Sequence, residues 1–346
     1  MTSGRGSRRL SVVIPNFNHG SIIRNAIHAV AGQISGEDEI IVVDDGSTDG
    51  SLENLTLLQE QLPFVRVVAL EKNHGAIFAL NRGIHEARGA YLNFGAADDL
   101  LLPGTVAILM AALVQHPQAA FASCECTVLD MDTGKKAFRP PVRPAYASAF
   151  LSPADVARAH RHIDNWILTG TAIARRDAIL EAGGFDASLG SFADGFLFRH
   201  MAFQHGCCFV PHMGLVWQVS SKGFSRSQAA DPVVSMVRLA TALERMRAIP
   251  AFPPWYPDIF ERRWRFAIGK IAADASPMNN AVLAHICRGP FGHAVMRSAC
   301  AIRGSFGRFI ALAWLSLQER PTSYVGLVRT WLSRRMAPAL EVNDFG

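Results

Sequence analysis

Several familiar signatures are missing from this sequence. No Gly-x-Gly-x-x-Gly turn follows a strand pattern and no Gly-x-x-x-x-Gly-Lys occurs, which argues against a dinucleotide oxidoreductase and a P-loop enzyme. There is no internal repeat and no low-complexity tract. Neither zinc-ligand nor redox spacing relates the six cysteines, so we expect them to be reduced and packed within strands and helices. They are Cys124, Cys126, Cys207, Cys208, Cys287 and Cys300.

The sequence also lacks an apolar run long enough to be a secretory signal or a membrane span. The apolar run after the basic first residues stops at Pro15, and the longest apolar stretch near the other end, residues 309–317, is too short to cross a bilayer. We therefore expect a cytoplasmic protein with a disordered segment at residues 1–8. Peripheral attachment to the inner face of the membrane is compatible with this pattern.

Composition predicts a folded protein of more than one part. The 346 residues are 49% hydrophobic and 18% charged, which excludes general disorder and allows a large core. Charge is unevenly spread: residues 1–225 hold 18 Lys and Arg against 21 Asp and Glu, whereas residues 226–346 hold 16 against 8. Such asymmetry suggests that the two parts have different functions.

The first hundred residues alternate between strand and helix patterns. Apolar or β-branched runs at 10–14, 39–43, 65–70 and 90–94 predict strands, and the segments 22–30, 52–62 and 76–87 between them predict helices. Strands separated by helices form parallel sheets, whose ligands bind beyond the carboxyl ends of the strands. Three polar segments fall at such ends, so we expect residues 15–18, 44–45 and 98–99 to converge.

The remainder of the chain is less regular. A helix is expected at 104–115, strands within 119–129, and a proline-rich basic loop at 135–150. From residue 232 onward the pattern is helical, with breaks at prolines 250–257 and 290.

Two acidic clusters could carry chemistry. The adjacent carboxylates of Asp98 and Asp99 repel each other, and a hard cation such as Mg²⁺ or Mn²⁺ would offset that cost. A helix N-cap with an acidic first turn would account for the same pair without a metal. Likewise Asp44 and Asp45 either accept hydrogen bonds from a base or ribose, or simply form part of a capped turn.

Taken in order, five segments resemble family 2 glycosyltransferases of the GT-A fold. They are SVVIPNFN (11–18), IVVDDGSTD (41–49), NHG (73–75), GAYLNFGAADD (89–99) and GGFD (183–186). The resemblance implies an α/β fold, with a Rossmann-like, mostly parallel sheet flanked by helices. It covers a GT-A domain at 9–225, made of a nucleotide-sugar-binding half at 9–104 and an acceptor half at 105–225, with a helical C-terminal region at 226–346.

The resemblance also implies roles for individual residues. Phe17 would lie beside the base, Asp45 would bind it, and Asp98 would ligate the metal with Asp99 in support. The nucleotide sugar would be bound by Pro15, Asn16, Phe17, Asn18, Asp44, Asp45, Asn73, Gly75, Asn81, Ala97, Asp98 and Asp99. The loops on the acceptor side would include Gly170, Thr171, Gly184 and Asp186.

Two departures from the family pattern concern the chemistry. The usual Asp-x-Asp reads Ala96-Ala97-Asp98, so its first carboxylate is missing. The catalytic base is often one of two consecutive acids, whereas here Asp194 precedes a glycine; we predict Asp194 as the base, with Asp186 as the alternative.

These parts predict an inverting transfer. A sugar would pass from a nucleotide-diphosphate donor, most commonly UDP in this family, to a hydroxyl of a glycan or lipid-linked acceptor in surface polysaccharide or similar glycan synthesis, with Mn²⁺ or Mg²⁺ as cofactor. The alternative is a catalytically silent GT-A-like protein that binds a nucleotide or acts as a scaffold, and Ala96 is what favours it.

The C-terminal helices allow three interpretations. Val325, Val328, Trp331 and Leu332 share one face of a predicted helix, with arginines nearby. Such a helix packs as a cap on the catalytic domain with its arginines in solvent, lies in a membrane interface, or contacts a partner protein. Nucleic acid is not expected as a partner, since no known binding motif occurs.

Overall fold

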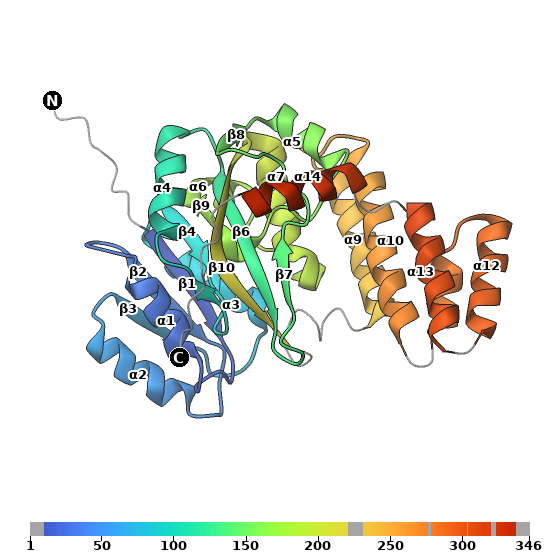
Figure 1. The fold of residues 1–346 in the computed structure, drawn as a ribbon. Coiled ribbons are helices and arrows are strands. Elements are labelled where there is room, and N and C mark those ends of the chain that lie inside the picture. Colours follow the sequence, from blue (N-terminus) through green and yellow to red (C-terminus); the bar gives the residue numbers. More distant parts are fainter. Residues whose placement is uncertain (1–9, 221–230, 276–277, 303, 320–322, 337–346) are drawn as a thin grey trace.

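The computed structural model describes residues 10–220, 231–275, 278–302, 304–319 and 323–336 (Figure 1). The predicted disordered segment at 1–8 and the predicted domain boundary at 225/226 lie outside these residues. The strands are β1 (Leu10–Asn16), β2 (Glu39–Asp44), β3 (Val65–Ala69), β4 (Tyr91–Phe94), β5 (Leu100–Leu101), β6 (Phe121–Asp130), β7 (Lys136–Arg139), β8 (Ala149–Leu151), β9 (Ala172–Arg175) and β10 (Cys207–Val219).

In the first hundred residues, helices alternate with these strands as predicted, and further helices follow up to residue 205. They are α1 (Ile23–Ala31), α2 (Ser51–Gln61), α3 (Ala76–Glu86), α4 (Thr105–Gln115), α5 (Pro153–His160), α6 (Arg176–Glu181) and α7 (Ala193–His205), with 3₁₀ turns η1 (Thr169–Thr171) and η2 (Ala187–Phe192). Beyond them lie α9 (Pro232–Ala248), α10 (Tyr256–Asp274), α11 (Asn280–Ile286), α12 (Gly289–Ala301), α13 (Ser305–Glu319) and α14 (Tyr324–Met336).

One mixed sheet of ten strands organises the fold. Its order is β3-β2-β1-β4-β9-β6-β10-β5, with β7 added at β6 and β8 at β10. The pairs that β1, β2, β3 and β4 form with one another are all parallel, as the alternating sequence predicts. Strand β6 also runs parallel to β10. The short strand β9 pairs antiparallel with both β4 and β6 and thereby joins the two halves of the sheet.

Alternate residues of the parallel strands face two separate cores. Val12 and Val42 lie in one core with residues of α1, α2 and α4, whereas Val13 and Val43 lie in the other with residues of α3 and α7. Because both faces of the sheet are covered, these strands can be continuously apolar. The result is a sheet between two helical layers (Figure 1).

The first strand is longer than predicted. It continues through Pro15 to Asn16 and pairs with β2 along its whole length, whereas the sequence places its end at Pro15. The Val13 carbonyl accepts a hydrogen bond from Gly95 on the β4 side, but β4 pairs with β1 no further than Val13. Pro15 shares that orientation, since residues two apart on a strand point the same way, so its missing N–H removes no sheet bond.

Two smaller predictions were also wrong. The proline-rich segment at 135–150 contains β7 and the start of β8, because short exposed edge strands give little periodic signal. The helix predicted at 22–30 starts one residue later, since Ile22 precedes α1 and is 39% exposed. The cysteines are free, and five of the six are buried, which confirms the prediction of reduced thiols.

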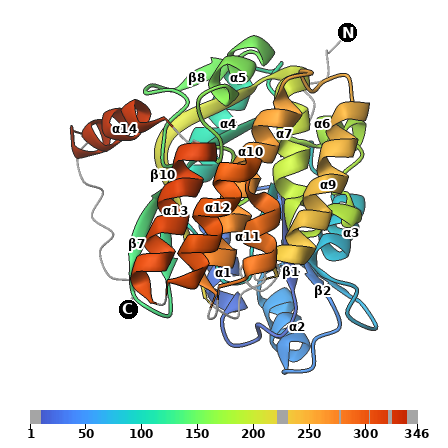
Figure 2. The same cartoon turned by 90° about the vertical axis from the view of Figure 1, so that its right-hand side faces the viewer.

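The C-terminal helices extend one core rather than forming a separate one. Leu239, Phe260, Ile268 and Leu315 belong to the same buried cluster as residues of α3 and α7. Figure 2 shows α10 to α13 side by side, with α14 standing apart from α12 and α13 in both views. No helix in the described part of the chain is long and apolar enough to cross a membrane.

Candidate functional site

The carboxyl ends of β1 and β2 are joined by a buried polar network. Asn16 Nδ2 donates to Asp44 Oδ2 at 2.7 Å, and the Ser47 hydroxyl donates to the same oxygen at 2.7 Å. The Ser47 amide also donates to Asp44 Oδ1 at 3.0 Å. Both oxygens of Asp44 are therefore engaged within the protein. Asn16 Oδ1 remains a buried acceptor with no hydrogen-bond donor among the described residues.

Phe17 and Asn18 form the rim above this network. Asn18 adopts a left-handed conformation with φ of 58°, and its Oδ1 accepts from the Thr48 amide at 2.8 Å. The Ser47 hydroxyl in turn accepts from the Asn18 amide at 2.9 Å. These bonds hold the 17–18 turn against the turn between β2 and α2. Phe17 is 40% exposed, so its ring is accessible to a ligand.

Asp45 fixes a second loop to the same edge. Its two carboxylate oxygens accept from the backbone amides of His74 at 2.8 Å and Gly75 at 2.7 Å. Asn73 Oδ1 also accepts from the Gly75 amide, at 2.9 Å. Gly46 has φ of 72°, and a Cβ there would meet the Lys72 carbonyl carbon at 2.6 Å, so only glycine allows the two turns to approach.

The acidic pair lies after β4, as predicted. Asp99 Oδ1 accepts from the Gln218 amide at 3.0 Å, which links the pair to β10. Burial and the neighbouring charge of Asp98 raise the pKa of Asp99 to about 8, against the opposing effect of the Gln218 hydrogen bond. No hydrogen bond or ion pair between described residues fixes the Asp98 carboxylate, which leaves it available to a ligand.

A narrow hollow adjoins this pair. Its lining includes Asn93, Ala96, Asp99 and Gly170. Ala96 stands here in place of the family's first carboxylate. Ala97, predicted to bind the nucleotide sugar, has a buried side chain within the core, so only its backbone can reach a ligand.

Asp98 and Asp99 fit a metal only in part. Within the described residues no third His, Cys, Asp or Glu joins them to complete a cluster. Mg²⁺ and Mn²⁺ are, however, commonly held by one or two carboxylates together with phosphate oxygens and water. The donor set thus suits a cation that arrives with a diphosphate rather than one held by the protein alone.

The short turn η1 connects the acidic pair to the predicted base. Gly170 lies against Asp99, where a Cβ at Gly170 would stand 3.8 Å from Asp99 Oδ2. One residue earlier, the Thr169 hydroxyl donates to Asp194 Oδ2 at 3.3 Å. The next residue, Thr171, is buried and its hydroxyl donates to the Leu168 carbonyl at 2.9 Å. Asp99 and Asp194 therefore both lie next to η1, one at Gly170 and the other at Thr169.

Asp194, the predicted base, lies in the first turn of α7. Protein packed around its carboxyl raises its pKa, an effect opposed by the Gly195 amide, the charge of Arg199 and the Thr169 hydroxyl. The residue nevertheless remains exposed to solvent. Arg199 Nη1 also donates to the Gly195 carbonyl at 2.8 Å, which holds the first turn of α7 in place.

The carboxylate of Asp186, the alternative base, contacts other groups. Its Oδ1 accepts from the Ser188 amide at 2.9 Å and caps η2, while its Oδ2 lies 3.4 Å from Arg245 Nε on α9. Such contacts stabilise a turn. Of the two candidates, Asp194 is the one connected to the acidic pair through η1.

Asn81, predicted to bind the donor, makes its side-chain hydrogen bonds within the protein. Its side chain exchanges two hydrogen bonds with the Phe185 backbone, at 2.8 and 3.0 Å, and so holds the loop that contains Gly184. Sequence reasoning missed Thr169, Ser47 and Gln218. Ser47 could have been found from its place in the acidic turn, whereas nothing in the sequence links Gln218 to Asp99.

Comparison with known proteins gives this arrangement its context. The model of the family described as Glycosyl transferase family 2 matches residues 11–181. The uncharacterized glycosyltransferase YibD of Escherichia coli is 31% identical over 176 residues, or 51% of each chain. A putative teichuronic acid biosynthesis glycosyltransferase, TuaG of Bacillus subtilis, is 37% identical over 90 residues, covering 26% of this chain and 36% of TuaG.

Solved structures match over more of the chain. S. aureus TarS 1–349 in complex with UDP-GlcNAc superposes with a TM-score of 0.63 at 16% identity, covering 91% of this chain and 93% of that one. The mannosyltransferase PcManGT from Pyrobaculum calidifontis, in complex with GDP-Man and Mn²⁺, gives 0.53 at 19% identity, covering 94% and 87%. These likenesses establish the fold alone.

The chain matches curated relatives such as these over 30% to 65% of their own length, while the fold likeness extends over nearly the whole chain. The ordered motifs, the matching family model and the GT-A architecture agree with one another. Residues 11–181 of the chain belong to glycosyltransferase family 2.

Proposed function

We propose that this protein is an inverting glycosyltransferase that moves a sugar from a nucleotide-diphosphate donor, with UDP as the nucleotide, to a hydroxyl of a glycan or lipid-linked acceptor. The observation that carries the proposal is the position of η1, with Gly170 against Asp99 and Thr169 bonded to Asp194. Complexes of fold neighbours with UDP-GlcNAc and GDP-Man support a nucleotide-sugar donor. TuaG, which is named for teichuronic acid synthesis, supports a surface polysaccharide as product.

The donor would bind along the carboxyl ends of the strands. The exposed Phe17 ring would stack on the base, and Asn16 Oδ1 is a buried acceptor that a donor N–H or O–H could satisfy. The fixed loop at Asn73–Gly75 and the rim at Pro15 and Asn18 would enclose the nucleotide. Asp44 and Asp45 would act chiefly by holding these loops, because their oxygens already accept hydrogen bonds from the protein.

Asp98, supported by Asp99, would hold Mn²⁺ or Mg²⁺ together with the diphosphate. When bound, the cation would stabilise the charge that develops on the departing nucleoside diphosphate. Asp194 would take the proton from the acceptor hydroxyl as its oxygen bonds to the anomeric carbon. The bond from that carbon to the diphosphate breaks on the opposite face, so the configuration inverts in one displacement. The acceptor would enter beside Gly170, Thr171 and Gly184, with Asp186 holding the adjacent turn.

The test is UDP release from a panel of UDP-sugars, with and without Mn²⁺, by the wild type and Asp98→Asn. We expect Asp98→Asn to lose metal-stimulated release by about a hundredfold or more, because the leaving diphosphate loses its charge stabilisation. Glu53→Gln, an exposed change on α2, is the matched control and should keep wild-type activity.

Equal Mn²⁺-stimulated turnover by Asp98→Asn and the wild type would overturn the proposed metal site. Thermal shifts with UDP but no turnover by the wild type with any donor would favour the silent, nucleotide-binding alternative that Ala96 suggests.

A further inference from the structure

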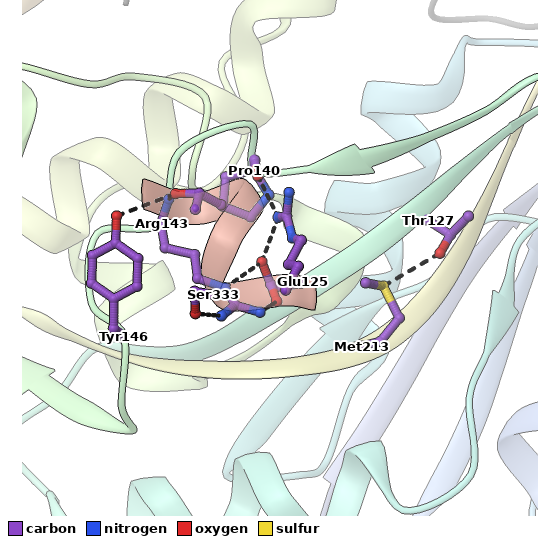
Figure 3. Close-up of polar contacts among 9 residues, drawn as sticks. Glu125, Thr127, Pro140, Arg143, Tyr146, Met213 and Ser333 are labelled. Atoms are coloured by element: carbon purple, nitrogen blue, oxygen red, sulfur yellow. Dashed lines mark hydrogen bonds and ion pairs between the residues drawn. The ribbon is translucent and has the colours of Figure 1, made fainter. Parts of the chain in front are cut away.

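The last described helix packs on the protein with its polar side. Thr330 is fully buried, and its hydroxyl oxygen accepts from the Arg143 amide at 3.1 Å. Arg143 Nη1 donates to the Ser333 hydroxyl at 2.7 Å. Figure 3 shows Arg143 and Ser333 meeting beside Glu125, with Tyr146 at the edge of the group. Polar side chains on this side of α14 therefore bond to the rest of the molecule, next to the apolar contact that Leu327 makes with the core.

A buried carboxylate explains this orientation. Glu125 on β6 is only 1% exposed, and a charge buried to that degree needs partners. Arg143 and Arg334 both form ion pairs with it, and Arg334 Nη2 donates further to the Pro140 carbonyl at 2.6 Å. Because α14 supplies one of the two arginines, turning the helix over would leave Glu125 underpaired.

The apolar side of α14 consequently faces outward. Its exposed positions are spaced one, three or four residues apart and so form a single stripe along the helix. They are Tyr324 (65% exposed), Val325 (80%), Val328 (59%), Trp331 (51%) and Leu332 (48%). A surface helix of a globular protein normally has the opposite arrangement, with its apolar stripe against the core. A cap on the catalytic domain, one of the three interpretations of the sequence, does not account for an apolar stripe that faces outward.

The charges around the stripe are all of one sign. α14 carries three arginines and no acidic residue. Arg335 lies with its guanidinium carbon 3.8 Å from the centre of the Trp331 ring, and Arg329 lies 4.2 Å from that of Tyr146. Both are exposed. An apolar stripe with tryptophan and bordering arginines suits the boundary between the headgroups and acyl chains of an anionic bilayer.

The neighbouring edge strand extends the same chemistry. Phe138 on β7 is 51% exposed, and Arg334 lies over its ring at 5.3 Å. Lys135 and Lys136 at the start of the strand are exposed as well. Phe138 thus adds exposed apolar area beside α14. A second copy of the chain would bring the same positive charges against each other, which disfavours self-association through this face.

We propose that α14 is a docking surface for an anionic lipid bilayer, with the stripe from Tyr324 to Leu332 inserted and Arg329 and Arg335 at the headgroups. The polar contacts with Glu125 and Arg143 would fasten the docked helix to the catalytic sheet. This inference does not rest on the proposed sugar transfer, since docking needs no donor. It specifies how a lipid-linked acceptor could be reached from the membrane surface.

The test is sedimentation of the full chain with vesicles of phosphatidylcholine alone or of equal parts phosphatidylcholine and phosphatidylglycerol. The wild type should sediment with the anionic vesicles, and Val328→Asp should lower that binding at least roughly tenfold, because it removes one inserted side chain and adds a charge. Arg329→Gln with Arg335→Gln should lower it by roughly tenfold and weaken its dependence on salt.

Leu57→Asp on α2 is the matched control, since Leu57 is 50% exposed and α2 lies far from α14 in both cartoon views. It should bind vesicles like the wild type. Every variant should release UDP in solution at the wild-type rate, so a failure of docking can be told apart from a failure of the proposed activity. Quenching of tryptophan fluorescence by lipids brominated in their acyl chains, reduced in Trp331→Phe, would confirm insertion.

Three results would overturn the proposal. One is a wild type that binds neither kind of vesicle. Another is that Phe309→Asp on α13 loses vesicle binding while Val328→Asp keeps it; Phe309 is 65% exposed. The third is a wild-type dimer that Val328→Asp converts to a monomer while neither protein binds vesicles.

Discussion

The side-chain amide of Asn81 on α3 is bound to the backbone of Phe185 through both its N–H and its C=O. Asn81 Nδ2 donates to the Phe185 carbonyl at 2.8 Å, and Asn81 Oδ1 accepts from the Phe185 amide at 3.0 Å. Phe185 itself is buried against Phe94 at the end of β4. One asparagine on α3 therefore positions the Gly183–Asp186 loop, 104 residues away along the chain.

Replacement of this asparagine should weaken the attachment of the Gly183–Asp186 loop to α3 and lower the stability of the fold. Asn81→Asp keeps the acceptor for the Phe185 amide but places a carboxylate oxygen against the Phe185 carbonyl, and we expect a loss of about 1–3 kcal/mol in the free energy of unfolding. Urea denaturation measures this loss. Asn54→Asp on α2 is a control for the same chemical change; its Nδ2 donates only once, to the Gly20 carbonyl, at 3.1 Å. An Asn81→Asp protein as stable as the wild type would contradict the structural role.

The assignment of the base makes a kinetic prediction. Asp194→Asn should lower kcat by about 10²- to 10⁴-fold, because the acceptor hydroxyl loses its proton acceptor, while the affinity for UDP stays unchanged. Asp186→Asn should chiefly lower stability, since Asp186 caps η2. Single-turnover transfer and UDP titration of both variants distinguish the roles. If Asp186→Asn abolished turnover and Asp194→Asn did not, the assignment would be reversed.

The same residue should set the acid side of the pH profile. A base works only when ionised, and packing around Asp194 raises its pKa above the ordinary 3.8. Activity should therefore begin to fall, as the pH is lowered, at a pH above that value. Measuring kcat/KM against pH for the wild type and Asp194→Glu would show whether the acid limb moves with the identity of this side chain.

Much of the structure of residues 10–104 could be predicted from sequence because the patterns that indicate its strands and helices are local. Continuous β-branched runs and helical periodicity identified the first four strands and their helices, and the order of these elements required a parallel sheet. The positions of Asp44, Asp45 and Asp98 at strand ends followed directly. Thr169 gave no such signal, because its role depends on how η1 lies between Asp99 and Asp194.

The C-terminal helix shows why the rest could not be predicted. The stripe through Val325 and Val328 was recognised, but periodicity identifies a face without saying which way it points. Its direction is decided by Glu125, about two hundred residues earlier, which needs the charge of Arg334. A buried acid inside a strand and an arginine on a distant helix have no sequence pattern that connects them.

Close packing of α3 on β1 gives a prediction about stability. A Cβ added at Gly83 would lie 2.2 Å from Val13 Cγ1, well inside normal contact. Gly83→Ala should therefore cost about 1–3 kcal/mol or more in the free energy of unfolding, although alanine favours helices. Gly83→Ala combined with Val13→Ala would relieve the contact and recover part of the loss. Thermal denaturation of Gly83→Ala, Val13→Ala and the double variant measures this coupling, and purely additive effects of the two changes would contradict it.

A buried histidine should make stability depend on pH. His160 on α5 is fully buried among aromatic rings, with Nδ1 3.2 Å from Asp164. Burial lowers its pKa from 6.5 to about 4, although Asp164 opposes the shift and the positive charges of Arg199 and Arg263 add to it. In the unfolded chain the same histidine would take up a proton near pH 6.5, so the unfolded state binds more protons between the two values.

The free energy of unfolding should accordingly fall as the pH is lowered from about 6.5 to 4, by roughly 3 kcal/mol from this residue alone. His160→Phe keeps an aromatic ring in the cluster and removes the titration, so it should flatten that part of the profile whatever its effect at pH 8. His85→Gln, an exposed change on α3, should leave the profile as it is. Urea denaturation at closely spaced pH values compares the slopes, and an unchanged slope in His160→Phe would mean that His160 is already charged in the folded protein.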